Sequence, residues 1–186
     1  MTGERARGSA RWPRACVIST ARFRLEPIAE VHAAEMSAVL SDPALYRYIG
    51  GEPPTVQDLR AKYARQAAGS SPRGDQGWLN WIVRSRGSGR AAGYVQATVS
   101  EESDIRIANL AWVIAPEWQG MGYATEAAQV MLEWLHGKGI TEFRASIHSE
   151  NSASQAVAYK LGFRASGQLL DGETVWALRR EANPPA

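Results

Sequence analysis

The sequence has little cysteine, little histidine and no long hydrophobic run. It contains one cysteine, Cys16, and three histidines in 186 residues. A single cysteine cannot form an internal disulfide, which suits a reducing compartment, so we expect a cytoplasmic protein. The histidines, His32, His136 and His148, lack the spacing of metal ligands, and we expect no metal site. No apolar run reaches the roughly 18 residues of a membrane-spanning helix, so no membrane partner is expected.

The numbers of basic and acidic residues are nearly equal. Lys and Arg number 21 against 19 Asp and Glu, for a formal net charge of +2. This near-neutral balance gives no reason to expect a nucleic-acid partner. Arginines gather near the start of the chain, among Gly, Ser and Ala residues. We expect residues 1–19 to form a flexible tail, residues 20–181 one domain, and residues 182–186 a frayed end.

Hydrophobic spacing and turn residues predict the order of elements in that domain. Strands are expected at residues 23–27, 78–85, 92–99, 105–115, 140–148, 163–170 and 174–178. Helices are expected at residues 28–40, 56–68, 120–138 and 151–161. The strand at 105–115 is apolar on both faces, which is typical of a central strand. The strand–helix–strand unit that follows implies one parallel pair within a largely antiparallel sheet, an α/β (α+β) fold.

The most informative segment runs from Trp112 to Ala127. It is an apolar strand that ends at a proline, then a glycine-bearing turn, then the start of an amphipathic helix. The first turn of a helix leaves backbone N–H groups free at its positive end, where an anion can bind. A P-loop is excluded because no Lys follows Gly122 before Lys138. A dinucleotide fingerprint is excluded because Thr125 stands where the third Gly is needed.

Three local patterns carry a resemblance to a known family. The turn Gln119-Gly-Met-Gly-Tyr-Ala124 matches Gln/Arg-x-x-Gly-x-Gly/Ala, and the match extends to Ala127. Further on, Asn151-x-x-Ser154 is followed by Lys160-Leu-Gly-Phe163. In this order the chain resembles the GNAT superfamily of acetyl-CoA-dependent N-acetyltransferases, and within it the RimJ/RimL branch. The resemblance implies the GNAT fold, whose parallel strand pair is splayed at the cofactor site, and acetyl-CoA as co-substrate.

The resemblance also implies a set of cofactor-binding residues. Backbone N–H groups of the turn would bind the pyrophosphate, with Gln119 adding a side-chain donor. The end of the preceding strand would pair with the pantetheine arm. Asn151 would touch that arm, although its position also suits an ordinary helix N-cap. The full set is Trp112, Val113, Ile114, Gln119, Gly120, Met121, Gly122, Tyr123, Ala124, Thr125, Asn151 and Ser154.

The catalytic residues depart from the family pattern. Many members carry a Tyr proton donor where this chain has Ala158, and Tyr159 lies about 100° further around the helix. Ser154 is therefore the predicted donor to the departing thiolate. The RimJ/RimL branch often has Glu where this chain has Asn109, which can orient an amine or a water but cannot accept a proton. No general base is predicted, and Tyr46, Tyr48 and Trp81 are expected to line the acceptor pocket.

We expect an N-acetyltransferase that moves an acetyl group from acetyl-CoA to a primary amine by direct attack. The acceptor is a protein N-terminus or a small-molecule amine. The alternative is a non-catalytic acyl-CoA-binding domain of the same fold, which Asn109 and Ala158 favour. The identity of the acceptor and the oligomeric state stay open, with a homodimer as one option.

Overall fold

The computed structural model describes residues 11–182. Within them lies one sheet with the strand order β1-β2-β3-β4-β5-β6-β8-β7. The strands are β1 (Ile18–Ser19), β2 (Phe23–Pro27), β3 (Gly77–Ser85), β4 (Ala91–Glu102), β5 (Ile105–Ile114), β6 (Glu142–Ile147), β7 (Arg164–Leu170) and β8 (Glu173–Arg179). Neighbouring strands are antiparallel except β5 and β6, which are parallel. The predicted fold class is confirmed.

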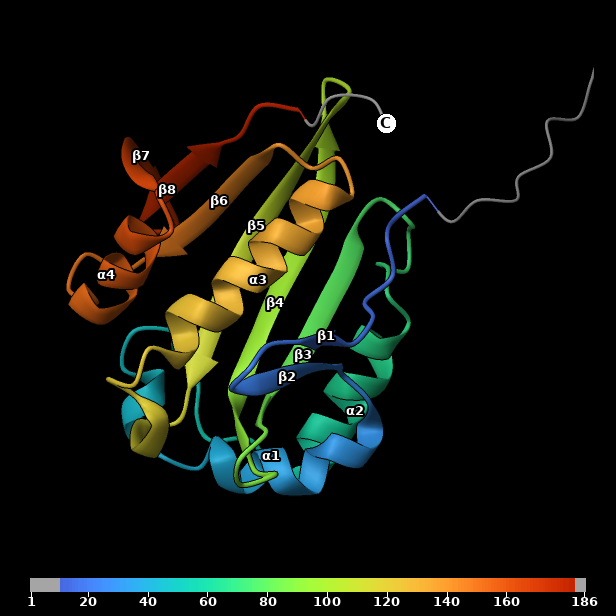
Figure 1. Ribbon diagram of the computed structural model, residues 1–186, viewed down its shortest axis with the longest axis vertical. Helices are drawn as coiled ribbons and strands as arrows, with labels where there is room; N and C mark the ends of the chain where they lie inside the picture. The colour runs from blue at the N-terminus through green and yellow to red at the C-terminus, as the bar shows by residue number, and fades with distance from the viewer. Residues whose placement is uncertain (1–10, 183–186) are drawn as a thin grey trace, which may run out of the picture.

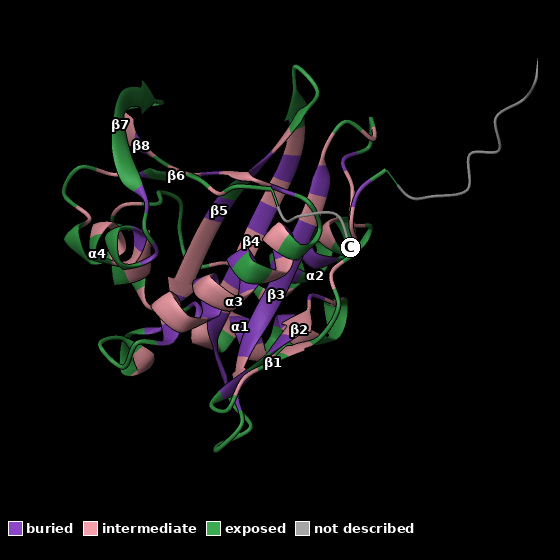
Figure 2. Ribbon diagram, turned by 45° about the horizontal axis from the view of Figure 1, so that its top comes forward, coloured by how far each residue is buried: buried purple, intermediate pink, exposed green. Residues whose placement is uncertain are grey.

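Helices cover both faces of this sheet (Figure 1). The helix α3 (Tyr123–Gly137) lies along one face, with α4 (Ser152–Lys160) beside the end of β6. The helices α1 (Ala33–Val39) and α2 (Val56–Ala67) pack on the other face. Short 3-10 turns precede three elements: η1 (Glu30–His32), η2 (Pro43–Tyr46) and η3 (Pro116–Trp118). Buried residues concentrate along β3, β4 and the inner side of α3, whereas β7 is exposed (Figure 2).

The helix α3 follows from its hydrophobic spacing. Its apolar stripe is buried against the sheet through Ala127, Ala128, Met131, Leu132 and Leu135. The helix begins at Tyr123, not at residue 120 as predicted. Gly120 and Gly122 have φ angles of 73° and 81°, which an α-helix cannot contain. The glycines therefore form the turn before the helix and leave its first N–H groups exposed.

The parallel pair β5–β6 is short. β5 pairs with β4 along its whole length, but with β6 only between Ile107–Asn109 and Glu142–Arg144. Beyond that point the two strands separate, which confirms the predicted splay. The N–H of Ala115 donates to the carbonyl of Ala92 on β4 at 2.8 Å. Because backbone direction alternates along a strand, the N–H and C=O groups of Ile114 and Trp112 face the gap beside β6.

The first helix and the N-terminal segment differ from expectation. The predicted helix at 28–40 is divided into η1 and α1, whereas α2 starts at the predicted cap, Thr55, in a capping box with Asp58. The predicted tail is wrong for residues 11–19. Trp12 is buried against Gly77, and its Nε1 donates to the carbonyl of Gly74 at 3.0 Å. Residues 1–10 and 183–186 lie outside the described part of the chain.

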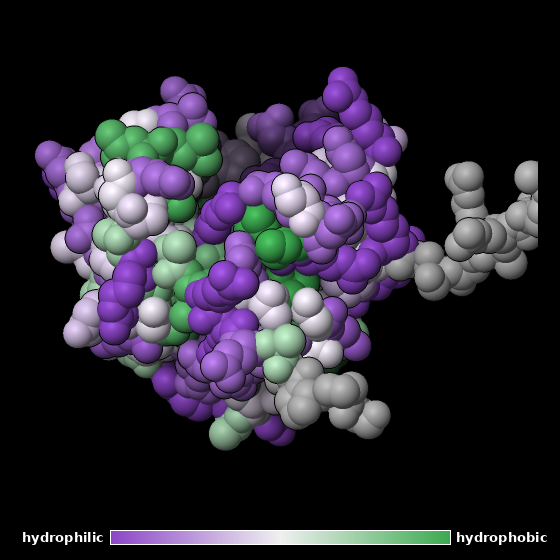
Figure 3. All heavy atoms as spheres, turned by 90° about the horizontal axis from the view of Figure 1, so that it is seen from above, coloured by the Kyte–Doolittle hydropathy of each residue, from purple (hydrophilic) through white to green (hydrophobic). Residues whose placement is uncertain are grey.

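The remaining elements end close to their predicted bounds, and β1 is an addition. No helix within residues 11–182 is long and apolar enough to cross a membrane. Viewed from its upper end, the surface is mainly hydrophilic, with hydrophobic residues in small patches (Figure 3).

Candidate functional site

The turn before α3 presents free backbone donors. Gly122 is the N-cap of the helix, and no side chain caps it. The helix N-terminus therefore keeps unpaired N–H groups at the positive end of its dipole. A side chain at Gly120 would meet nothing within 4 Å, so its glycine serves the left-handed backbone and leaves open space above the turn. Such a turn can bind an anion, and pyrophosphate binding by residues 120–125 stays a prediction.

Arg22 adds a cation to this turn, and the sequence did not reveal it. Its Nη2 donates to the carbonyl of Met121 at 2.9 Å, and its Nη1 pairs with Glu126 at 3.1 Å. The guanidinium lies over the ring of Tyr123, 4.7 Å from its centroid. Arg22 is 99 residues from Met121 in the sequence, so only the folded sheet brings them together.

The side chain of Gln119 has a different role from the predicted one. Its Nε2 donates to the carbonyl of Ile114 at 2.8 Å, so the amide turns back toward β5. The expected side-chain donor to the pyrophosphate is corrected to a support for the end of the strand. The carbonyl of Ile114 is thereby taken, while the backbone N–H of Ile114 still faces the gap between β5 and β6.

The residues of the predicted cofactor set on β5 and at the start of α3 have packed side chains, so they offer a ligand mainly their backbone groups. Ile114 and Tyr123 are buried in the core, and Trp112 packs against the same cluster. Val113 packs on the opposite face, near Tyr94. The open strand edge at Trp112 and Ile114 can pair with an extended ligand as an added strand would.

The first turn of α4 combines a cap with a half-buried hydroxyl. Asn151 is the N-cap, and its Oδ1 accepts from the backbone N–H of Ser154 at 3.1 Å. Ser154 is half-buried, whereas Ala158 is fully buried in the core. Tyr159 is 64% exposed and lies beneath the guanidinium of Arg164, so it is turned away from the core. The helix therefore presents Ser154, and no tyrosine, near the end of β6.

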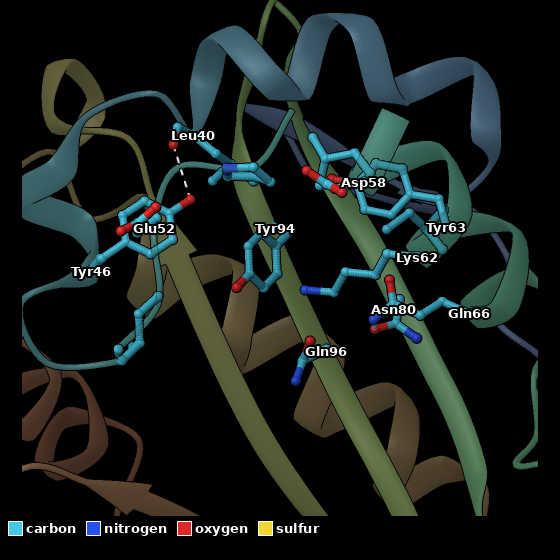
Figure 4. Close-up of a pocket in the computed structure, with 15 residues that line it drawn as sticks. Leu40, Tyr46, Glu52, Asp58, Lys62, Tyr63, Gln66, Asn80, Tyr94 and Gln96 are labelled. Atoms are coloured by element: carbon cyan, nitrogen blue, oxygen red, sulfur yellow. Dashed lines mark hydrogen bonds between the residues drawn. The ribbon is translucent and has the colours of Figure 1, made fainter. Parts of the chain in front are cut away.

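A cavity of about 300 Å³ lies on the other face of the sheet. It is bounded by the segment after η2, by α2 and by strands β3 and β4 (Figure 4). Tyr46 lines it, and its hydroxyl donates to the carbonyl of Leu40 at 3.0 Å. Tyr94 lines it from β4, directly opposite Val113 of β5. The cavity thus lies on the face opposite α3, and Tyr94 brings it beside Val113 near the end of β5.

The predictions for Trp81 and Tyr48 need correction. Trp81 is fully buried on the α3 face, with its Nε1 donating to the carbonyl of Cys16 at 2.7 Å, so its place in the acceptor pocket is wrong. Tyr48 does not line the cavity. It stacks on His148 at the end of β6, with ring centroids 5.3 Å apart.

His148 is not a ready base in this arrangement. Its Nδ1 accepts from the backbone N–H of Glu150 at 3.1 Å. A neutral imidazole that accepts at Nδ1 carries its proton on Nε2, so neither nitrogen keeps a free lone pair.

Asn109 is exposed on β5, opposite Thr98 and Arg144, and it does not line the cavity. Among residues 11–182 no cluster of three or more His, Cys, Asp or Glu side chains is arranged to hold a metal ion.

Burial sets the protonation of the cavity. It raises the pKa of Tyr46 and of Tyr63, and with the neighbouring Tyr46 it raises the pKa of Tyr94 to about 12. These phenols therefore keep their protons and act as hydrogen-bond donors at neutral pH. Burial also lowers the pKa of Lys62, and the nearby charge of Arg65 lowers it further.

The fold and this site define the class of protein. The sequence matches the family described as acetyltransferase (GNAT) domain over residues 22–164, and the chain belongs to that family. The predicted family and the predicted enzyme class, an acetyltransferase, are confirmed. No curated protein matches the chain closely enough for comparison.

Solved structures share the fold at low identity. RimL, a ribosomal L7/L12 alpha-N-protein acetyltransferase in complex with coenzyme A, superposes with a TM-score of 0.76 at 19% identity, covering 90% of this chain and 99% of that one. The microcin C7 self-immunity acetyltransferase MccE, in complex with acetyl-CoA and AMP, gives 0.72 at 16%, covering 87% and 94%. The aminoglycoside acetyltransferase AAC(6')-Ib, in complex with coenzyme A, gives 0.70 at 20%, covering 85% and 95%.

Proposed function

We propose that this chain is an acetyl-CoA-dependent N-acetyltransferase of the RimJ/RimL-like branch that acetylates a primary amine. One observation carries the proposal. An uncapped, glycine-built anion site and a polar cavity approach the end of β5 from opposite faces of the sheet. A donor bound at the turn and an acceptor bound in the cavity can therefore meet at the splay between β5 and β6. Related structures bind coenzyme A or acetyl-CoA, which supports the identity of the donor.

The residues at the turn and splay fit coenzyme A. Backbone N–H groups of residues 120–125, with Arg22 beside them, suit the pyrophosphate. The open edge at Trp112 and Ile114 suits the pantetheine arm. A backbone N–H facing the gap can stabilise negative charge on the thioester oxygen as it develops. Asn151, the N-cap of α4, and Thr125, in the first turn of α3, belong to the same proposal.

The reaction exchanges one bond for another. The amine nitrogen attacks the thioester carbonyl, the C–N bond forms, and the C–S bond breaks to release coenzyme A as a thiol. The amine loses a proton and the thiolate gains one. We assign delivery of the thiolate's proton to the hydroxyl of Ser154, which regains a proton from water, and the amine's proton also passes to water. Asn109 has no part in this step, because it lies outside the cavity where β5 still pairs with β6. Much of the rate then comes from holding two substrates in one cleft.

Binding and turnover test this proposal separately. Acetyl-CoA at 100 times its dissociation constant should stabilise the folded protein by about 2.7 kcal/mol. An unchanged melting temperature at millimolar acetyl-CoA would rule out the donor site. Amine-dependent release of thiol from acetyl-CoA should follow, across a panel of peptides and small amines.

A second candidate is a non-catalytic acyl-CoA-binding domain. Ala158, fully buried in the core, favours it, because α4 then presents no tyrosine to the departing thiolate. This candidate predicts the same thermal stabilisation by acetyl-CoA, without release of thiol for any amine in the panel.

A further inference from the structure

A lysine reaches into the cavity without a carboxylate partner. Lys62 extends from α2 toward β4, and its Nζ lies 5.9 Å from the centroid of the Tyr94 ring (Figure 4). Lys62 is an exposed residue as a whole, and its partial burial beside the cavity lowers its pKa. None of the ion pairs within residues 11–182 includes Lys62. A sheltered cation of this kind is stabilised when an anion binds beside it.

Donors surround this lysine. Tyr63 is 2% exposed, lines the cavity, and its buried hydroxyl has no hydrogen-bond partner among the described residues. Tyr94 lines the same space and keeps its proton at neutral pH. An ammonium and two phenol hydroxyls form a wall that donates hydrogen bonds. The complementary group on a ligand is one with negative oxygens.

The opposite wall carries the other sign. Glu52 lies with Tyr46 on the side of the cavity nearer the end of β5 (Figure 4). Asp58 also lines the cavity, on α2 one turn before Lys62, and its Oδ2 accepts hydrogen bonds from the N–H and hydroxyl of Thr55 in the capping box of α2. Glu52 is the acid on the side of the splay, and Lys62 is the cation on the other side (Figure 4). A ligand with an amine at one end and an anionic group at the other matches this polarity.

We propose that Lys62 selects the acceptor, and that the acceptor class is a primary amine bearing a carboxylate, such as a peptide with an acidic first residue. The carboxylate binds Lys62, and the amine lies toward Glu52 and the end of β5. This inference rests on the proposed function, because it concerns the acceptor half of the same site. Polycationic amines are disfavoured, since they would bring a second positive charge to Lys62.

The experiment compares two acceptors of equal size. Aspartyl-alanine amide and asparaginyl-alanine amide differ by one negative charge, and both are assayed for thiol release with saturating acetyl-CoA. The wild-type protein should prefer the aspartyl peptide about tenfold in kcat/KM, mainly through KM. In Lys62→Met and Lys62→Gln the preference should fall to about one, and in Lys62→Glu it should reverse.

Arg60→Met is the matched control, because Arg60 is an exposed cation on the same helix that does not line the cavity. It should keep the tenfold preference. Equal kcat/KM for the two peptides in the wild-type protein would overturn the inference, as would a preference that survives Lys62→Met. An equal fall in kcat for both peptides in Lys62→Met would overturn it too, since that result marks a general role for Lys62 rather than a selective one. Turnover without preference leaves the acetyltransferase proposal intact, whereas no turnover with any amine overturns both.

Discussion

The candidate donor site and the cavity, which lie on opposite faces of the sheet near the end of β5, are formed by different parts of the chain. On the α3 side, the candidate donor site consists mainly of backbone groups within one continuous segment, from Trp112 to Thr125. On the α2 side, the cavity consists of side chains from separate segments, including Tyr46, Lys62 and Tyr94. Backbone sites depend on chain conformation and tolerate many side chains. Side-chain sites change with single substitutions, which is how one fold can serve different acceptors.

The largest effect should come from placing a charge in the backbone site. Gly122→Glu adds bulk and a negative charge at the N-terminus of α3, where φ is 81°. We expect acetyl-CoA affinity to fall at least about a hundredfold, or about 2.7 kcal/mol, in a calorimetric titration. Gly139→Glu is the control, because Gly139 has a φ of 80° and open space around it at the other end of the helix. A Gly122→Glu variant with normal affinity would place the phosphates elsewhere.

A substitution between the two sites should damage both. A Cβ on Gly93 would lie 2.0 Å from the carbonyl oxygen of Val113 and 2.9 Å from the Cα of Ile114. Gly93→Ala should therefore push the end of β5 aside and destabilise the fold by about 1–3 kcal/mol in urea unfolding. Acetyl-CoA affinity and turnover should fall together. Gly87→Ala, where the nearest atom is 4.0 Å away, should change neither.

The donor site could be predicted from sequence because its determinants are local. The Gly120–Gly122 turn, the apolar strand before it and the cap at Asn151 are each contained in a few neighbouring residues. The start of the helix expected at residues 56–68 was readable for the same reason, since its cap, Thr55, stands directly before it. Arg22 was missed because a contact across 99 residues leaves no local pattern. Trp12 was missed similarly, since its burial depends on Gly77 and the turn at Gly74.

The acceptor side could be predicted only in part. Tyr46 lines the cavity, and its role toward an acceptor stays a prediction. Trp81 was assigned to the wrong face of the sheet, although the alternation of side chains along β3 indicates the right one. Trp81 shares a face with Leu79 and Val83, whereas the intervening Asn80 faces the cavity. Lys62 could not be singled out, because a lysine on a surface helix is normally solvated and only the cavity beneath it gives it another role.

A test of the proton path should give an intermediate effect. Ser154→Ala should lower kcat about tenfold while acetyl-CoA affinity stays unchanged, because a hydroxyl that protonates the thiolate acts after binding. The rate should be measured across pH in pre-steady-state and steady-state experiments. Ser152→Ala, an exposed neighbour on α4, serves as the control. An unaltered pH profile of kcat in Ser154→Ala would remove the assigned role.

Arg22 should contribute less, since its side chain is 45% exposed. Arg22→Met should weaken acetyl-CoA binding about fivefold, and the difference from wild type should shrink with added salt as screening increases. Arg24→Met, two residues further along the chain in β2 and paired with Glu26, should leave affinity unchanged. A salt-independent loss in Arg22→Met would point to disruption of the turn rather than to a lost charge.

The smallest effect concerns how α1 is held over the cavity. A hydrogen bond from Arg84 lowers the pKa of Glu35, against the opposing effect of burial, and Glu35 also accepts from the N–H of Ala91 at 2.8 Å. A lowered folded-state pKa stabilises the fold above the unfolded value of about 4.5 and loses that effect as pH falls through the folded value. After allowance for solvent screening, Glu35→Gln should cost about 0.5–1 kcal/mol at pH 6. The difference in unfolding free energy should shrink as the pH falls below about 4.5, and a difference that stays constant in acid would contradict this assignment.

The central claim is that a donor bound at the Gly120–Gly122 turn reacts with an amine held on the opposite face of the sheet. The most direct test is thiol release from acetyl-CoA by the wild-type protein, measured with and without amines. We predict release that depends on the amine and is abolished by Gly122→Glu. Tight binding of acetyl-CoA without amine-dependent release, across peptides and small amines, would contradict the claim and support the non-catalytic domain.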